Sequence, residues 1–104
     1  MGNRGITESG DDYIKFGNGT LLCFGLPSTD DSTYATVIFP VRFIATPIIL
    51  ATAQYTGEHY YHVYIREMSE ISFNVQTLYT NNASGLTKPG TYLNFSYLAI
   101  GRWK

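Results

Sequence analysis

The sequence predicts an all-β fold, an antiparallel β-sandwich of six or seven strands. Short apolar segments are separated by turns rich in Gly, Pro, Asn and Asp, as in strands joined by hairpins. Several segments alternate apolar and polar residues, which places one kind of side chain on each face of a strand. No window of about eleven residues or more shows the 3.6-residue period of an amphipathic helix.

The chain begins with a polar segment, residues 1–12, in which Ile6 is an isolated aliphatic residue. Such a composition buries almost no apolar surface and predicts a flexible lead-in from a longer polypeptide. Residues 13–104 are expected to form one β domain. Its first element is a hairpin, because apolar segments at 13–16 and 20–25 flank Gly17, Asn18 and Gly19, which tolerate the positive φ of a tight turn.

The central segments continue the strand pattern. Residues 34–39 alternate, with Val37 and Phe39 on one face and Thr36 and Ile38 on the other. Pro40 and Pro47 bracket a connection, since proline cannot donate to a central ladder, and residues 48–55 form the next strand. Strand 59–67 places Tyr61, Val63 and Ile65 toward the core.

The late segments complete the sandwich. Residues 71–78 alternate, with Ile71, Phe73 and Val75 inward and Ser72, Asn74 and Gln76 outward. Residues 81–90 are a polar loop. The last strand, 91–103, is apolar on both faces, so it should be central in its sheet or buried by a partner chain.

Composition predicts self-association and excludes several kinds of partner. Charged residues make up 14% of the chain, against roughly 25% in an average soluble domain, which leaves apolar surface for a homo-oligomer to cover. Seven basic and eight acidic residues give no basic field for nucleic acid. The single Cys23 reads as a small buried hydrophobe. No apolar stretch is long enough for a membrane span, so no membrane insertion is expected.

The sequence contains no pattern that supports catalysis. Neither Cys23 nor any serine lies in a nucleophile motif, and the paired acids at 11–12 and 30–31 are adjacent, which is a poor arrangement for flanking a glycosidic bond. His59 and His62 are three apart and therefore point to opposite sides of a strand. We expect a protein that is not an enzyme and that uses no cofactor and no metal.

The most suggestive group of side chains is the outward row of strand 59–67, which consists of Tyr60, His62, Tyr64 and Arg66. Aromatic rings offer flat faces to sugar C–H groups, while His and Arg donate hydrogen bonds to hydroxyls. The same row would also suit a subunit interface, and both alternatives stay open. Asn81 and Asn82, at a loop tip, either add amide hydrogen bonds to a ligand or form the turn itself.

Five sequence segments together resemble a known family. They are Tyr-Ile-Lys-Phe-Gly-Asn-Gly at 13–19, Leu-Leu-Cys-Phe-Gly at 21–25, Val-Ile-Phe-Pro-Val-Arg-Phe at 37–43, Thr-Pro at 46–47, and Leu-Ala-Ile-Gly-Arg-Trp-Lys at 98–104. In this order they resemble the C-terminal receptor-binding domain of bacteriophage and prophage tail-fibre proteins. Such domains are similar to H-type lectins, which are six-stranded sandwiches assembled as trimers that bind sugars near subunit boundaries.

The resemblance implies a homotrimeric tip of a phage tail fibre, joined to the rest of the fibre, that binds a bacterial surface glycan or a surface protein. It places the protein in the virion after synthesis in the cytoplasm of the bacterial host. Two departures are Phe24 and Leu98, where the family often has Trp. A structural cap that holds the fibre trimer together without touching the receptor is the alternative.

Overall fold

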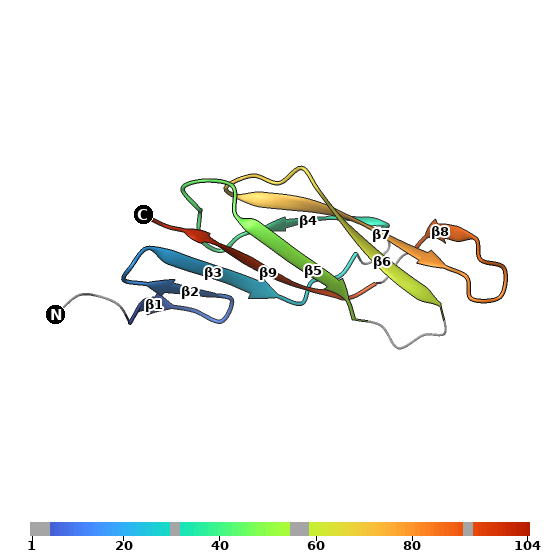
Figure 1. The fold of residues 1–104 in the computed structure, drawn as a ribbon, viewed down its shortest axis with the longest axis horizontal. Coiled ribbons are helices and arrows are strands. Elements are labelled where there is room, and N and C mark those ends of the chain that lie inside the picture. Colours follow the sequence, from blue (N-terminus) through green and yellow to red (C-terminus); the bar gives the residue numbers. More distant parts are fainter. Residues whose placement is uncertain (1–4, 30–31, 55–58, 91–92) are drawn as a thin grey trace.

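Two antiparallel β-sheets form the computed structural model, which describes residues 5–29, 32–54, 59–90 and 93–104 (Figure 1). The first sheet has five strands in the order β1-β2-β3-β9-β5. Its strands are β1 (Ile6–Ser9), β2 (Tyr13–Phe16), β3 (Thr20–Gly25), β9 (Phe95–Arg102) and β5 (Ile48–Ala53). The second sheet has the order β4-β7-β6, and β8 also pairs with β7. Its strands are β4 (Tyr34–Ile38), β7 (Ser72–Thr80), β6 (Tyr60–Arg66) and β8 (Thr87–Pro89).

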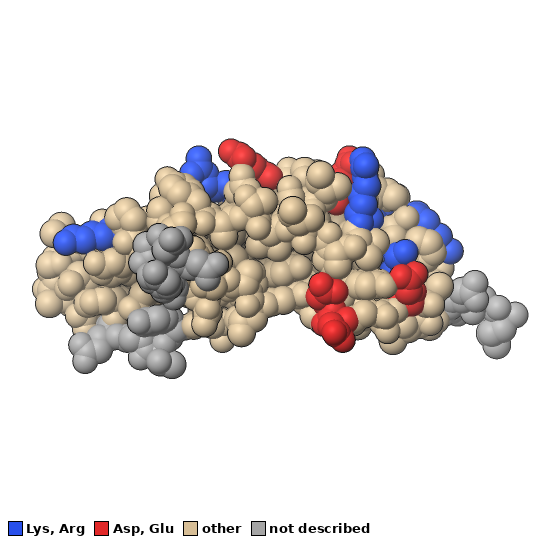
Figure 2. Space-filling view, turned by 180° about the vertical axis from the view of Figure 1, so that it is seen from behind, with Lys and Arg blue, Asp and Glu red and all other residues tan. Residues whose placement is uncertain are grey.

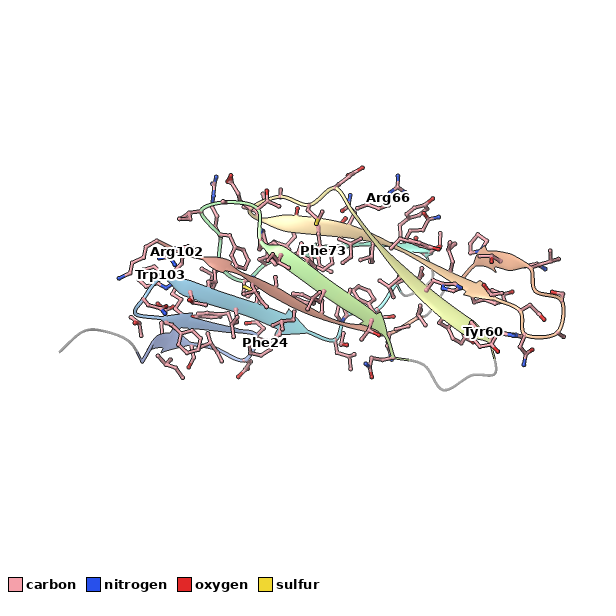
Figure 3. All side chains as sticks on the ribbon, in the orientation of Figure 1. Phe24, Tyr60, Arg66, Phe73, Arg102 and Trp103 are labelled. Atoms are coloured by element: carbon pink, nitrogen blue, oxygen red, sulfur yellow. The ribbon has the colours of Figure 1, made fainter. Side chains whose placement is uncertain are left out.

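The predicted first hairpin is confirmed, and the C-terminus closes onto its turn. β2 pairs with β3, and Gly19 between them has a φ of 100°, which a side chain would strain. The Arg102 guanidinium donates to the Asn18 carbonyl oxygen at 2.9 Å, and the Trp103 indole donates to the Phe16 carbonyl oxygen at 2.8 Å. The Gly-Asn-Gly and Ile-Gly-Arg-Trp segments are therefore in contact (Figure 3).

The core lies between the sheets and is centred on aromatic rings. Phe39 packs on Phe43 and Phe73, with ring centroids 5.0 and 5.6 Å apart, and Phe73 packs on Tyr97 at 5.3 Å. Phe39 and Phe73 come from the four-stranded sheet and its continuation, whereas Tyr97 comes from β9. Cys23 is fully buried beside them, as the sequence predicted.

Most of the predicted strands are confirmed, and the last strand is central, between β3 and β5. The predicted strand count was too low, because the described residues form nine strands. β1 and β8 were missed: each is short, and all of their side chains are exposed, so neither has an apolar pattern to reveal it. The division into a lead-in and a domain stays a prediction, although β1, which lies inside the predicted lead-in, pairs with β2 of the predicted domain.

Ile71 is a second correction, since its side chain is 51% exposed and does not point into the core. β7 begins one residue later, and the Ser69 hydroxyl accepts hydrogen bonds from the backbone N–H groups of Ile71 and Ser72. Ile71 thus belongs to a turn, where strand alternation does not apply. The predicted strand residues 55 and 91–92 and the acidic pair at 30–31 lie outside the described residues.

Burial makes the stability of the fold sensitive to alkaline pH. Loss of hydration raises the pKa of the Cys23 thiol from 9.0 to about 11 and that of the Tyr97 phenol from 10.0 to about 12. The folded state thus holds both protons more tightly than the unfolded chain. The resulting stabilisation is complete below about pH 9 and is lost as the pH rises through the folded pKa values.

We therefore expect the free energy of unfolding, measured by chemical denaturation, to fall above about pH 9, by on the order of 2 kcal/mol for each group. Cys23→Ala should delay the start of this decline, because only the phenol then contributes. A free energy that stays constant up to about pH 11 would contradict the expectation.

Candidate binding site

The outer face of the four-stranded sheet carries the polar and aromatic row that the sequence indicated on β6. Tyr60 and Tyr64 are 65% and 50% exposed, Arg66 is exposed and His62 is half-buried. Between them, Tyr61, Val63 and Ile65 are half-buried, and the predicted inward orientation is confirmed for Val63 and Ile65, which pack against the core. Figure 3 shows that Tyr60 and Arg66 lie toward opposite ends of β6.

Strand pairing extends this row across the sheet. Gln76 in β7 lies between Tyr34 of β4 and Tyr64 of β6. Two residues along β7 and on the same face, Asn74 lies between Thr36 of β4 and Arg66 of β6. Two cross-strand rows therefore combine side-chain amides with aromatic, hydroxyl and cationic groups.

Hydrogen bonds orient the amides in these rows. The Gln76 amide donates to the Tyr34 hydroxyl at 3.3 Å, and the Arg66 guanidinium donates to the Gln76 amide oxygen at 3.5 Å, a long contact. The Thr36 hydroxyl donates to the Asn74 amide oxygen at 2.8 Å, and the Asn74 amide nitrogen donates to the Glu67 carboxylate. Because both ends of Asn74 are engaged, its side chain is held in one orientation.

These rows border a depression of about 380 Å³, which we call the polar hollow. Its lining consists of Tyr34, Ala35, Thr36, Arg66, Glu67 and Asn74. Of the predicted site residues it includes only Arg66, and Tyr64 adjoins it through Gln76. Alternation had placed Asn74 outward and Thr36 on the face opposite Val37 and Phe39, but the pairing of β4 and β7 that brings Thr36 and Asn74 beside Arg66 was not visible in the sequence.

The remaining predicted residues lie at the other end of β6. The His62 ring nitrogen Nε2 is 2.8 Å from the Thr80 hydroxyl oxygen. Asn82 donates its backbone N–H to the His59 ring at 3.3 Å, so the loop tip contacts the start of β6. The Asn81 side chain is occupied within its own turn, because its oxygen accepts the N–H groups of Ala83 and Ser84 at 2.9 and 3.1 Å. The six predicted residues therefore extend along β6 to the turn at 81–82, only Arg66 among them lines the polar hollow, and their role in binding stays a prediction.

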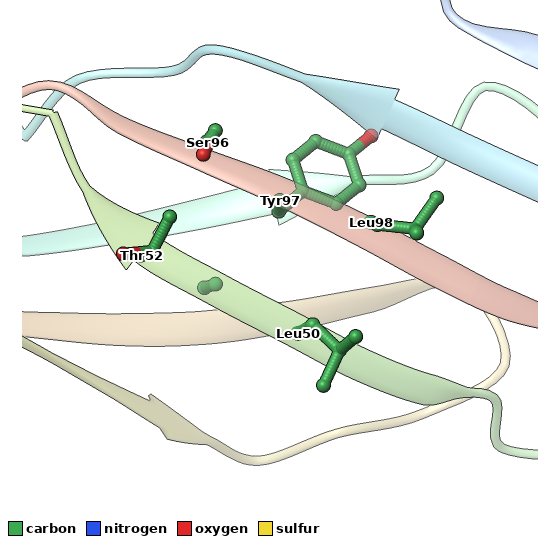
Figure 4. Close-up of a pocket in the computed structure, with 6 residues that line it drawn as sticks. Leu50, Thr52, Ser96, Tyr97 and Leu98 are labelled. Atoms are coloured by element: carbon green, nitrogen blue, oxygen red, sulfur yellow. The ribbon is translucent and has the colours of Figure 1, made fainter.

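The outer face of the five-stranded sheet has the opposite character. Side chains that point away from the core form two cross-strand rows here, with Ile48 and Leu50 68% and 56% exposed. We call this surface the apolar face; it consists of Leu22, Phe24, Ile48, Leu50, Leu98 and Ile100. A shallow hollow of about 220 Å³ lies between β5 and β9, bordered by Leu50, Thr52, Ser96 and Leu98 (Figure 4).

Charged residues are sparse, at 14% of the chain. Figure 2 shows small charged groups separated by wide uncharged areas on one side of the molecule. Within the described ranges, no three His, Cys, Asp or Glu side chains gather into a metal-binding group. No helix in the described part of the chain has the length and hydrophobicity of a membrane span.

Comparison with known proteins supports the fold. No protein-family model and no curated protein matches the chain. Among solved structures, the chain is similar to an N-truncated R1-type pyocin tail fibre, with a TM-score of 0.64 and 14% sequence identity. The alignment covers 92% of this chain and 83% of that chain. The chain therefore shares an antiparallel β-sandwich fold with a tail-fibre protein, as the resemblance in sequence implied, whereas the likeness to H-type lectins stays a prediction.

The role of Asn81 in its turn can be tested by two substitutions. Asn81→Ala removes the oxygen that accepts two backbone N–H groups, and should lower the free energy of unfolding by about 1 kcal/mol. Asn81→Asp keeps the acceptor and should unfold like the wild type in chemical denaturation. If the two variants are equally destabilised, the turn does not depend on this oxygen.

Proposed function

We propose that this chain is a receptor-binding domain at the tip of a phage-tail-like fibre, which attaches its particle to a bacterial surface glycan or protein. The observation that carries the proposal is the exposed row on β6 together with its partners on β7 and β4. This row offers aromatic faces, amides and a guanidinium on a rigid sheet, which is the chemistry that sugar hydroxyls and C–H groups require. The fold shared with a pyocin tail fibre supports a place in a phage-tail-like fibre.

The domain works as a homotrimer joined to the rest of its fibre in the virion, after synthesis in the host cytoplasm. Support comes from the apolar face, whose exposed aliphatic side chains a monomer would leave in water. The low content of charged residues, 14%, also favours self-association, because it leaves apolar surface to be covered. Assembly through one sheet leaves the outer face of the other sheet free for the receptor.

A second function is a cap that only holds the fibre trimer together. The same apolar face favours it, since trimer formation needs no ligand. Binding, and not catalysis, is the activity of either candidate. The two differ in whether the β6 row contacts a receptor.

Assembly is tested by sedimentation of the isolated chain. We expect a species of three times the chain mass of 11.7 kDa at micromolar concentration. Leu50→Glu should shift it toward monomers, because assembly would bury an unpaired carboxylate at a cost of several kcal/mol. Ile38→Glu, at an exposed position on the other sheet, is the matched control and should remain trimeric. A wild-type monomer would refute assembly through the apolar face.

Receptor contact is tested by Tyr64→Ala. Loss of ring area should weaken binding to host cells by about tenfold while sedimentation stays unchanged, because Tyr64 faces away from the core. A shift toward monomers would instead place this row in the subunit interface, where aromatic anchors contribute about 2 kcal/mol or more. Wild-type behaviour in both measurements would assign the row to ordinary surface. Ile38→Ala serves as the control for loss of exposed apolar area.

A further inference from the structure

Glu67 has a backbone conformation that glutamate rarely adopts. Its φ is 50°, and it is the one non-glycine residue with positive φ in the described part of the chain. β6 ends at Arg66, and the chain then turns toward β7. Glycine or asparagine takes this left-handed conformation more readily, so a glutamate here lowers the stability of the fold. Backbone strain of this kind is often retained where the side chain has a function.

The Glu67 side chain has a defined place in the polar hollow. Its carboxylate accepts a hydrogen bond from the Asn74 amide, whose oxygen is held in turn by Thr36. The neighbouring Arg66 lines the same hollow and forms no ion pair with any described residue. An acceptor-only group and a donor-only group therefore border one depression without neutralising each other.

The opposite charges of Glu67 and Arg66 indicate which class of ligand the hollow can bind. Glu67 repels an anion and attracts a cation, and Arg66 does the reverse, so the pair gives the hollow no net charge that would favour an ion over a neutral polyol. A hydroxyl both donates and accepts, so neighbouring hydroxyls of one sugar ring can donate to Glu67 and accept from Arg66. Tyr34, which is half exposed at the border of the hollow, offers a ring face to the sugar C–H groups. The volume of about 380 Å³ lies near the lower end of ligand pockets and suits a short saccharide.

We propose that the polar hollow is a subsite for a neutral saccharide, with Glu67 as the hydroxyl acceptor and Arg66 as the donor. This inference rests on the proposed function, because it names the ligand class of the same outer face. It adds β4 and the β6–β7 turn to a site that the sequence had placed on β6 and at the loop tip.

The test compares Glu67→Gly with wild type in two measurements. Glycine relieves the positive φ, so its unfolding temperature should be no lower than that of the wild type, although it adds freedom to the unfolded chain. Its affinity for neutral oligosaccharides, identified on a glycan array and then titrated, should fall about tenfold or more. Glu67→Gln keeps the length and one acceptor and should lose less affinity. Glu70→Gln, which removes a carboxylate paired with Arg42 outside the hollow, should bind normally.

Binding of whole cells, measured on the same proteins, separates the possible failures. If wild type attaches to host cells and Glu67→Gly attaches equally well, the subsite is refuted and the proposed function stands. Array binding confined to acidic saccharides also refutes the subsite. If wild type binds neither cells nor any array saccharide, the proposed receptor function fails and the subsite fails with it.

Discussion

The pairing of β9 with strands on both sides is the constraint on which the rest of the structure depends. β9 pairs with β3 along six positions and with β5 along six more. It therefore has a hydrogen-bonded neighbour on each side and no exposed strand edge. Its inner side chains, Phe95, Tyr97 and Ala99, are buried against the second sheet. Its outer side chains, Leu98 and Ile100, continue the apolar face. One strand therefore supplies both the core and the surface proposed for assembly.

The end of β9 also holds the first hairpin in place. Arg102 and Trp103 donate hydrogen bonds to backbone carbonyl oxygens of the β2–β3 turn, and the ammonium groups of Lys15 and Lys104 lie 5.1 and 4.8 Å from the Trp103 ring centroid. These contacts give a physical reason for the closing Ile-Gly-Arg-Trp segment: its last side chains donate to turn carbonyl oxygens, one of which, that of Phe16, also accepts the Gly19 N–H at 3.0 Å. Two segments far apart in the sequence thus form one structural unit.

The two outer faces have different proposed functions, assembly for one and receptor binding for the other. The apolar face lacks charge and suits contact with identical subunits, while the second sheet presents amides, tyrosines and a guanidinium held by cross-strand hydrogen bonds. Strands fix such side chains more firmly than loops do, since pairing on both sides restricts the backbone of β7. The strained Glu67 lies where this rigid face meets a turn, and there its carboxylate reaches back to Asn74.

The sequence by itself determined the elements whose side chains alternate or are continuously apolar. It predicted the first hairpin and the outward row of β6, because burial of one face is a local signal that repeats every second residue. For the last strand, apolar on both faces, it predicted either a central place or burial by a partner chain. It missed β1 and β8, whose side chains are all exposed, and misplaced Ile71, which lies in a turn. Only the tertiary structure decided which strands outside the first hairpin are neighbours. The polar hollow depends on that choice, since the pairing of β7 with both β6 and β4 brings Thr36, from a distant segment, beside Asn74 and Arg66, and no periodicity within one segment encodes a partner strand.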